Sequence, residues 1–428
     1  MLALLPIVVL FILFFLNIPV AFALIGASLF YFIFINTSMP MEMAIQQFVT
    51  SIESFPYLAV PFFIMVGAVM NHSGISEAMM KFAEVLVGHT RGGLAQVNVL
   101  LSAMMGGISG SANADAAMQS KILVPEMKKK GFSAPFSAAI TAASSSVSPV
   151  IPPGTNLILY AIIANVSVGA MFLAAYTPGI LMSGALMLTV HIIAVRRKFK
   201  PSRDEKASIK EIIIQFFKSV WALLIPFGII MGMRMGMFTP TEAGGIAVLF
   251  SLFVGFFVYK KLKIKHMPLI LMDTVKSTGA VMLIIASAKV FGLYLTLERI
   301  PQLITSSLVN MTDSPLVFLM VVNVMLLFIG MFIEGGAALV ILAPLLVPAA
   351  ISFGIDPVHF GMIFIVNIMI GGLTPPFGSM MFTVCTIVNV KLEDFVREVW
   401  PFIGALILVL ILLTYSEGIA LFTLNLFS

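Results

Sequence analysis

The sequence has little charge and almost no cysteine, and both shortages restrict its fold. Only 10% of the 428 residues are charged, whereas soluble globular proteins carry about 25% charged residues. A chain that is 60% hydrophobic cannot bury that much apolar surface in water, so lipid is expected to be its main solvent. The single cysteine, Cys385, excludes an intramolecular disulfide framework.

The sequence also lacks the residue alternation of barrel strands. Instead, apolar runs near the ~20 residues of a bilayer crossing recur along the chain. Backbone polar groups in lipid must be satisfied internally, so these runs predict helices. The N-terminal run MLALLPIVVLFILFF has no preceding basic region and is expected to be a retained membrane helix. The net charge of +5 comes from basic clusters between apolar runs, as in cytoplasmic loops, so no nucleic-acid partner is expected.

Proline and glycine positions recur in the same order in the two halves of the chain. At an offset of 223 residues, the pairs are Pro125 with Pro348, Gly131 with Gly354, and Pro152-Pro153 with Pro375-Pro376. After one inserted residue at Phe377, the match continues with Gly154-Thr155 and Gly378-Ser379. Upstream, Asn98 pairs with Asn323. This ordered set predicts a duplication over the full length of the chain.

Charge indicates that the two halves face opposite ways. The linker 196–218 contains eight Lys and Arg residues, and the loop 260–265 contains four lysines, which predicts that both are cytoplasmic. The counterpart of that loop, 36–55, carries Glu42 and Glu53 but no Lys or Arg. Likewise, 121–130 has four lysines, whereas its counterpart 344–353 is uncharged. Equivalent loops on opposite sides predict an inverted repeat, which is typical of secondary transporters.

Each half contains a predicted re-entrant hairpin followed by a broken helix. The hairpins are 92–127, with the tip GGISGSANAD (106–115), and 315–350, with the tip FIEGGAA (332–338). The breaks are SSSVSPVIPPGTN (144–156) and GGLTPPFGS (371–379). Proline removes a backbone donor and glycine permits a turn, so each break leaves free carbonyls and free amides. Carbonyl ends suit Na⁺, and the positive amide ends suit a carboxylate.

These features divide the chain into two halves joined by the basic cytoplasmic linker 196–218. The first half, 1–195, comprises scaffold helices in 1–91, a hairpin and broken helix in 92–168, and a return helix in 169–195. The second half, 219–428, comprises scaffold helices in 219–314, a hairpin and broken helix in 315–390, and a C-terminal helix in 399–428. The predicted fold is an all-α polytopic membrane protein.

Four stretches carry a resemblance to a known family. GGISGSANADAAM (106–118), SPVIPPGTN (148–156), FTPTEAGGIAV (238–248) and GGLTPPFGSMMF (371–382) resemble signature stretches of the large membrane subunit of tripartite ATP-independent periplasmic (TRAP) transporters. The resemblance covers essentially the whole chain. It implies an elevator-type, ion-coupled carrier of the bacterial inner membrane and not an enzyme. It also implies two Na⁺ sites at the tips and breaks, with the substrate between them.

The resemblance further implies substrates and partners. Family substrates include sialic acids, C4-dicarboxylates and other organic acids, and the chain looks closest to the sialic-acid branch. The implied partners are a small four-helix membrane subunit, expected here as a separate chain, and a periplasmic substrate-binding protein. Two or more Na⁺ ions are expected to be coupled to transport, with no organic cofactor.

The tips and breaks supply the predicted site residues. For Na⁺, we expect Ser109, Gly110, Ser111, Ser146, Ser148, Gly335, Gly336, Gly371, Thr374 and Gly378. For the substrate, we expect Asn113, Asp115, Pro152, Gly154, Thr155, Asn156 and Ser379. The five histidines are scattered and have no Cys or acidic partners at ligand spacing, so no metal site other than for Na⁺ is expected.

Several residue roles stay open from the sequence alone. Asp115 either serves the site, caps a half-helix or pairs with Lys121, and Glu334 either neutralises a cation or binds backbone amides. Arg234 is either a substrate anchor or a residue at the outer interface or a subunit contact. The small residues at the tips alternatively serve close helix packing.

Two other functions also stay open. One is a stand-alone Na⁺/dicarboxylate symporter, without a binding protein. The other is an intramembrane serine hydrolase, because Gly107-Ile108-Ser109-Gly110 matches a G-x-S-G pattern. A hydrolase needs a base within hydrogen-bond reach of the serine, and His191 at the edge of the basic linker is poorly placed for that role.

Overall fold

The computed structural model describes residues 4–16, 18–36, 40–53, 55–203, 205–312 and 314–427. The side chains of 107–109, 230, 234 and 307–311 fall outside this description, so the alternatives for Arg234 lie there too. The regular structure of the described part is entirely helical and includes no strand. The all-α prediction is therefore confirmed.

The first half begins with scaffold helices and continues into shorter ones. In chain order the scaffold helices are α1 (Leu5–Phe15), α2 (Val20–Phe30), α3 (Met41–Thr50), α4 (Ala59–Ser73) and α5 (Ile75–Val87). They are followed by α6 (Gly93–Ser109), α7 (Ala112–Lys129), α8 (Ala134–Ser145), α9 (Thr155–Ala164) and α10 (Val168–Arg196). A π-helical turn, Tyr31–Ile35, extends α2.

The second half repeats this order after the linker. Its helices are α11 (Ile209–Arg234), α12 (Pro240–Phe253), α13 (Met267–Leu297), α14 (Ile300–Met311), α15 (Pro315–Phe332) and α16 (Gly335–Ser352). They continue with α17 (Pro357–Leu373), α18 (Ser379–Val388), α19 (Leu392–Tyr415), α20 (Glu417–Ala420) and α21 (Phe422–Phe427). Eight helices in the described ranges are long and apolar enough to cross a bilayer, which supports a multi-pass membrane protein. That number rests on length and composition, and it includes both helices of the second predicted hairpin, α15 and α16.

Helix boundaries recur between the halves at a nearly constant spacing. The pairs are α6 with α15, α7 with α16, α8 with α17, α9 with α18 and α10 with α19, and their first residues differ by 222 to 224 positions. The spacing increases by one between the second and fourth pairs, as the insertion at Phe377 requires. The opposite orientation of the halves in the membrane, and the domain limits, stay predictions.

A buried hydrogen bond is repeated along with the helices. Asn98 on α6 accepts from the Ser144 hydroxyl on α8, with 2.6 Å between Oδ1 and Oγ. At the equivalent place Asn323 on α15 accepts from Asn367 on α17, with 2.7 Å between Oδ1 and Nδ2. All four side chains are buried. A polar group buried in lipid costs free energy unless it is paired, so each half uses the same bond to fix its hairpin to its broken helix.

The two interruptions are also built alike. The helical path stops at Ser145 and resumes at Thr155, and in the second half it stops at Leu373 and resumes at Ser379. A Cβ on Gly154 would lie 2.1 Å from the Pro149 carbonyl oxygen, and one on Gly378 would lie 2.7 Å from the Gly372 carbonyl oxygen. Both turns therefore require glycine immediately before the second half-helix, because the backbone folds back on itself there.

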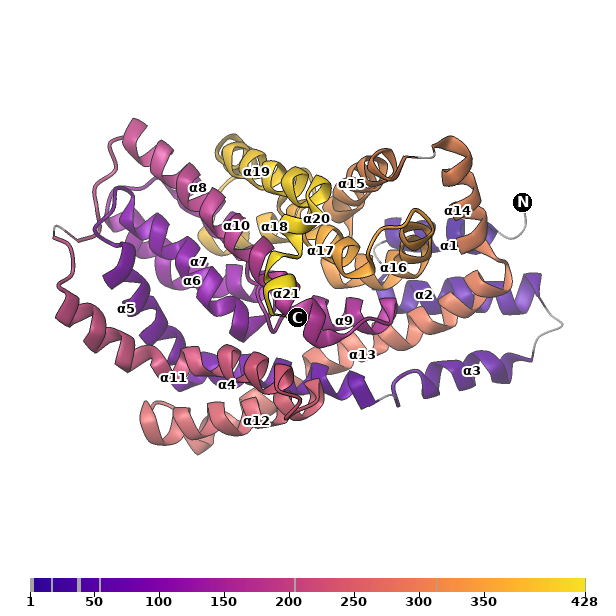
Figure 1. The fold of residues 1–428 in the computed structure, drawn as a ribbon, viewed down its shortest axis with the longest axis horizontal. Coiled ribbons are helices and arrows are strands. Elements are labelled where there is room, and N and C mark those ends of the chain that lie inside the picture. Colours follow the sequence, from indigo (N-terminus) through magenta and orange to yellow (C-terminus); the bar gives the residue numbers. More distant parts are fainter. Residues whose placement is uncertain are drawn as a thin grey trace.

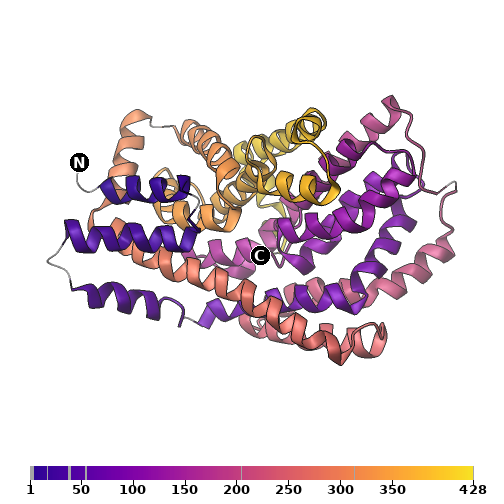
Figure 2. The same cartoon turned by 180° about the vertical axis from the view of Figure 1, so that it is seen from behind.

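Helices α3, α4, α11, α12 and α13 lie along one side of the hairpins and broken helices, whereas α14 packs against α16 (Figures 1 and 2). Helix α4 packs against α12 and α13, and α2 packs against α13. Figure 2 shows α13 as a long oblique helix through this layer. Its 31 residues extend about 46 Å at 1.5 Å per residue. Helix α16 contacts both α13 and α9, so α13 borders the elements that carry the tips and breaks.

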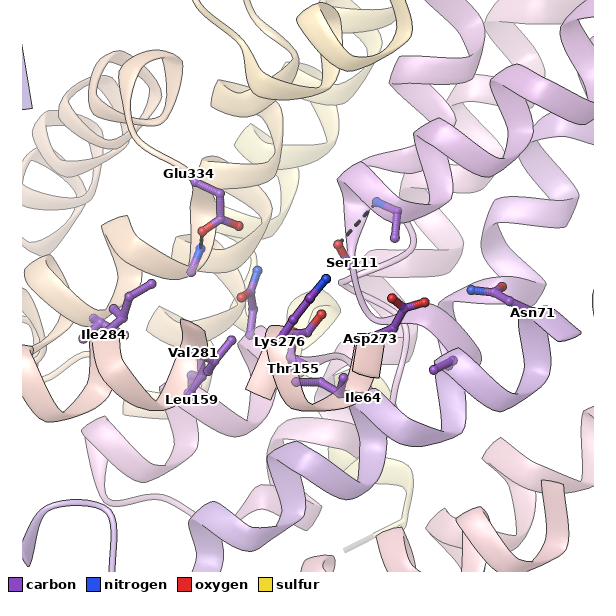
Figure 3. A pocket seen from close by; sticks show the side chains of 17 residues that line it. Ile64, Asn71, Ser111, Thr155, Leu159, Asp273, Lys276, Val281, Ile284 and Glu334 are labelled. Atoms are coloured by element: carbon purple, nitrogen blue, oxygen red, sulfur yellow. Dashed lines mark hydrogen bonds between the residues drawn. The ribbon is translucent and has the colours of Figure 1, made fainter. Parts of the chain in front are cut away.

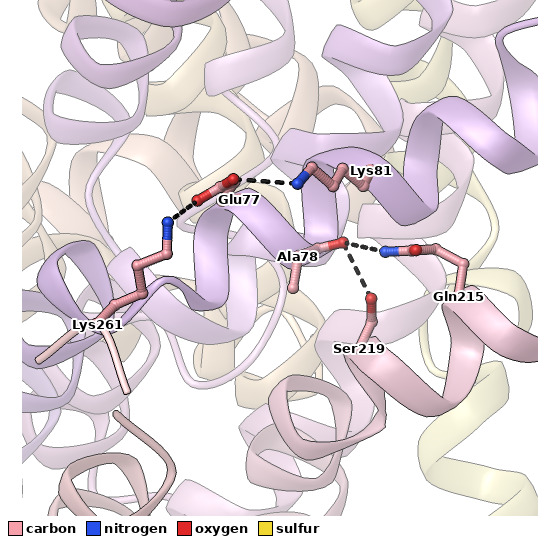
Figure 4. Close-up of polar contacts among 6 residues, drawn as sticks. All are labelled: Glu77, Ala78, Lys81, Gln215, Ser219 and Lys261. Carbon is pink, nitrogen blue, oxygen red and sulfur yellow. Dashed lines mark hydrogen bonds and ion pairs between the residues drawn. The ribbon is translucent and has the colours of Figure 1, made fainter. Parts of the chain in front are cut away.

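Polar contacts tie α5 to α11 and to the loop before α13 (Figure 4). The Glu77 carboxylate lies 3.0 Å from Lys261 Nζ and 3.1 Å from Lys81 Nζ. Hydrogen bonds from Lys261 and then Lys81 hold the pKa of the Glu77 carboxyl below its usual value. The Ala78 carbonyl accepts from Ser219 Oγ at 3.0 Å. Because the side chains of Glu77, Lys81 and Lys261 are about half exposed or more, their ion pairs fix geometry more than they add stability.

The packing of α15 on α17 predicts the effect of one methyl group. A Cβ on Gly371 would lie 2.7 Å from Gly330 Cα, which is backbone and cannot rotate away. We expect Gly371→Ala to destabilise the protein by about 1–3 kcal/mol through overpacking, measured as a lower thermal midpoint in detergent. Gly404→Ala on α19 is the matched control, because nothing lies within 4 Å of its added Cβ. Equal midpoints for the two variants would contradict this packing.

Candidate functional site

The first tip rests on the start of the second half-helix. Gly110 has a φ of +56° and separates α6 from α7, and Ser111 caps α7 by accepting from Ala114 N at 3.4 Å. Thr155 Oγ1 donates to the Gly110 carbonyl at 3.2 Å. A Cβ on Gly110 would lie 3.2 Å from Thr155 N. The glycine therefore provides both the left-handed turn and the close approach to α9.

The second tip reaches the same half-helix. Glu334 caps α16, accepting from Gly336 N at 3.0 Å and Ala337 N at 3.3 Å. Of the two alternatives for Glu334, the structure therefore shows the contact with backbone amides, which places the carboxylate at the positive end of α16. A Cβ on Gly336 would lie 3.4 Å from Asn156 Oδ1, so this tip lies beside the first break.

The two tips and both breaks enclose a small polar space of about 50 Å³. Of the predicted residues, it is lined by Gly110, Ser111, Asn113, Thr155, Asn156, Gly335 and Ser379. They come from four segments far apart in the sequence, at positions near 110, 155, 335 and 379. Glu334 and Gly372 border the same space.

A larger cavity of about 510 Å³ lies between the tips and the scaffold (Figure 3). From the predicted set, Ser111, Thr155, Asn156 and Gly336 line it. The opposite wall is formed by α4 and α13 and includes Asn71, Asp273, Lys276 and Ser277. Figure 3 shows Asp273 and Lys276 extending from α13 toward Ser111 and Thr155.

Asp273 and Lys276 were not among the residues predicted from the sequence. The available signal was their position inside the apolar stretch Ile264–Leu297. An ionisable residue within a membrane helix is costly and so indicates a functional site by default. All of the predicted site residues belong to the tips and breaks, so none of them lies on the wall that faces these segments.

Other predicted residues lie away from both cavities. Ser146 and Ser148 are fully buried, and the Ser146 hydroxyl donates to the Ala143 carbonyl at 2.7 Å. Thr374 Oγ1 donates to the Ile370 carbonyl at 2.7 Å. Pro152, Gly154, Gly371 and Gly378 line neither cavity. The side chain of Ser109 lies outside the described residues.

Asp115 joins the two helices of the first hairpin. It is 1% exposed, and its Oδ2 accepts from Ser102 Oγ at 2.7 Å and from Gln119 Nε2 at 2.8 Å. Lys121 is exposed, and in the described part of the chain Asp115 makes no ion pair. The pairing with Lys121 is therefore wrong. The half-helix cap is Ser111 instead, and Asp115 lies behind the tip and lines neither cavity.

The histidines do not form a catalytic or metal site within the described ranges. His359 is buried, and its Nε2 lies 2.8 Å from the Leu413 carbonyl oxygen. His191 is exposed on α10. Among described residues, no group of three His, Cys, Asp or Glu side chains converges on a point.

The contact between Thr155 and Gly110 predicts a local effect. Thr155→Val keeps the side-chain shape but removes the hydroxyl, and the loss should cost about 1 kcal/mol. We expect faster hydrogen exchange at residues 110–114 and a slightly lower thermal midpoint. Thr189→Val is the matched control, because that hydroxyl bonds only within α10, to the Ala185 carbonyl. Exchange at the tip that is equal in both variants would contradict the contact.

Comparisons with known proteins agree with this architecture. The profile of the family described as "Tripartite ATP-independent periplasmic transporter, DctM component" matches residues 7–419. The sialic acid TRAP transporter large permease protein SiaM of Vibrio cholerae is 39% identical over 418 residues, which cover 96% of each chain. The sialic acid TRAP transporter permease protein SiaT of Haemophilus influenzae is 37% identical over 96% of this chain and 66% of that protein. The C4-dicarboxylate TRAP transporter large permease protein DctM of Pseudomonas aeruginosa is 37% identical over 89% of this chain and 88% of that protein.

The similarity to solved structures, at 15% identity or less, supports the fold of this chain and no further property. The YdaH transporter of Alcanivorax borkumensis aligns with a TM-score of 0.66 at 15% identity, covering 88% of this chain and 89% of that one. MtrF of Neisseria gonorrhoeae aligns with a TM-score of 0.58 at 14% identity, covering 88% of this chain and 84% of that one. Taken with the family match along nearly the whole sequence, these findings mean that the chain belongs to the DctM family of TRAP transporter large permeases.

Proposed function

We propose that the chain is the transport subunit of a Na⁺-coupled TRAP symporter that imports small organic carboxylates across the bacterial inner membrane. It works with a separate small membrane subunit and a periplasmic binding protein that delivers the substrate. The related permeases are named for sialic acid, 2,3-diketo-L-gulonate and C4-dicarboxylates. These three are carboxylic acids, whereas a further related permease is named for isethionate, which is a sulfonate. The shared feature is an anionic acid group, and a carboxylate is the form proposed for this chain.

One observation carries the proposal: two hairpin tips and two helix breaks meet at one point beside a substrate-sized cavity. The 50 Å³ space is of the scale of one water, about 30 Å³ in the liquid, and hence of a bare ion. The neighbouring cavity of about 510 Å³ falls within the usual ~300–1,000 Å³ of small-molecule sites. The ions therefore belong in the small space and the substrate in the large one.

Helix ends supply the opposite charges that such a site needs. The last carbonyls of α8 and α17 face the breaks and suit Na⁺, whereas the first amides of α9 and α18 suit a carboxylate. The first amides of α16 already bond to Glu334. A substrate carboxylate is thus directed to the start of α9, where Thr155 and Asn156 line both spaces.

Transport follows from a shift between two states. Na⁺ binds first and lowers the electrostatic cost of bringing an anion to mid-membrane. The hairpins and broken helices then move together against α4, α13 and the other scaffold helices, in an elevator-type step. Both ligands must favour the same state, because equal affinity for the two states shifts nothing. The membrane potential adds about 2.3 kcal/mol per charge per 100 mV as Na⁺ moves inward.

Reconstitution tests this function. Proteoliposomes contain the chain and its small partner subunit, with the binding protein outside, and uptake of labelled N-acetylneuraminate and succinate is followed. We expect uptake of at least one probe to rise at least tenfold when an inward Na⁺ gradient replaces K⁺. Equal uptake in the two salts would exclude Na⁺ coupling. Full uptake by the chain alone would favour the stand-alone symporter.

A single substitution links transport to the site. Asn156→Ala removes the amide that borders both spaces, and we expect the half-saturating Na⁺ and substrate concentrations to rise at least tenfold. Gln46→Ala is the matched control, because it removes an exposed amide from α3. If both variants keep the wild-type values, Asn156 is not part of the site.

A further inference from the structure

Helix α13 carries two lysines placed symmetrically about its middle. Lys276 follows the first residue of the helix, Met267, by nine positions, and Lys289 precedes the last residue, Leu297, by eight. The 13 positions between the lysines correspond to about 20 Å along the axis. Both lie inside the continuous apolar stretch Ile264–Leu297, where a lysine is costly and so calls for a functional reason.

Each lysine lines a different cavity. Lys276 faces the 510 Å³ cavity beside the tips. Lys289 faces a second cavity of about 280 Å³, together with Gln47, Tyr57 and Thr296. Leu159 of α9 and Val340 of α16 line both cavities, so these cavities are successive spaces along the same pair of surfaces. One surface is α13, and the other belongs to the elements that carry the tips and the first break.

In the described part of the chain neither lysine forms an ion pair, although the Asp273 and Glu334 carboxylates line the same cavity as Lys276. In the other cavity, the buried Tyr57 hydroxyl has no hydrogen-bond partner among the described residues. Each cavity thus contains a lysine amine that makes no ion pair with a described residue and can pair with a ligand carboxylate.

The charge pattern assigns a side of the membrane to each cavity. Helix α13 follows the loop with Lys260, Lys261, Lys263 and Lys265, which is predicted to be cytoplasmic. The cavity with Lys276 therefore lies toward the cytoplasm, and the cavity with Lys289 lies toward the outer face. In the arrangement described here, the tips line the cytoplasmic cavity, which corresponds to an inward-facing state.

We propose that Lys276 and Lys289 are two scaffold cation sites for the substrate carboxylate, one for each state of the carrier. Lys276 pairs with the carboxylate when the tips lie at the cytoplasmic cavity. Lys289 pairs with it when the tips have moved along α13 toward Leu297. This assignment rests on the proposed function, because it requires both an anionic substrate and movement of the tips along a fixed helix.

The arrangement has an energetic purpose. A cation fixed to the scaffold interacts with the substrate in only one state, so a single lysine would bias the carrier toward that state. Two lysines equidistant from the middle of the helix remove this bias. The Na⁺ gradient is then left to set the direction of net transport.

The test measures affinity separately at the two faces of the membrane. Proteoliposomes hold the full chain with its small partner subunit, and the binding protein is added outside only, so only molecules in the native orientation are active. Half-saturating concentrations of labelled N-acetylneuraminate and of succinate are measured for entry and for exit. The variants are Lys276→Gln and Lys289→Gln, with Lys276→Arg and Lys289→Arg as charge-conserving partners. Lys265→Gln is the control for loss of an exposed lysine.

The expected results differ between the faces. Lys276→Gln should raise the half-saturating concentration for exit about tenfold and change that for entry less than twofold, and Lys289→Gln should do the reverse. The Arg variants and Lys265→Gln should stay within threefold of wild type. Equal effects on entry and exit, or no effect on either, would overturn the assignment. A lysine whose amine only extends to the lipid headgroups would not change the half-saturating concentration at one face alone. A wild-type complex inactive with both probes would instead overturn the proposed function.

A chemical rescue separates loss of charge from a folding defect. Cys385 is the single cysteine, so Cys385→Ala gives a cysteine-free background for Lys276→Cys and Lys289→Cys. Reaction with aminoethyl methanethiosulfonate restores a cation, whereas methyl methanethiosulfonate adds only a neutral group. We expect the first reagent to recover at least half of the lost affinity at the affected face and the second to recover none. Equal recovery with both reagents would overturn the assignment.

Discussion

The structure depends on one constraint: backbone groups in lipid must find partners inside the protein. Two breaks and two tips interrupt the helices and leave backbone amides and carbonyls that the helices themselves do not pair. Each half supplies partners for its own tip. Thr155 covers the carbonyl of the first tip, Glu334 covers the amides of the second, and all four segments close around one small polar space. The backbone groups that cost free energy to bury in lipid are therefore the same groups that surround the candidate site.

Close helix approach is the second requirement for that arrangement. Gly371 meets the backbone of Gly330 with no room for a methyl group, and Gly361 leaves space for the ring of Tyr160. These glycines let the helices approach each other, or a neighbouring ring, more closely than a larger residue would allow. Equivalent buried hydrogen bonds, accepted by Asn98 from Ser144 and by Asn323 from Asn367, then join each hairpin to its broken helix. In lipid, such packing and buried hydrogen bonds replace the hydrophobic force that assembles soluble cores.

Much of this architecture could be predicted from sequence, because the signals were backbone signals. Paired prolines and glycines located both breaks within a few residues, and polar tips located both hairpin turns. Roles of individual side chains were harder. Ser146 and Thr374 satisfy their own helices, and Asp115 joins α6 to α7, since a hydroxyl or carboxylate in a polar motif does not reveal which way it points. Asp273 and Lys276 are distant in sequence from both tips, and only the packing of α13 brings them to the cavity.

The single inserted residue, Phe377, makes the two halves chemically unequal. Its ring contacts Phe332 at the end of α15, with 5.1 Å between centroids, where the first half has a hydrogen bond from Thr155 to Gly110. An aromatic contact tolerates lateral displacement of one ring against the other, whereas a hydrogen bond depends on the angle between its donor and acceptor. The first tip is thus joined to its break by a hydrogen bond, whereas at the equivalent place the second half has an aromatic contact. A single inserted residue therefore changes the kind of contact at one tip while the order and spacing of the surrounding helices stay nearly the same in both halves.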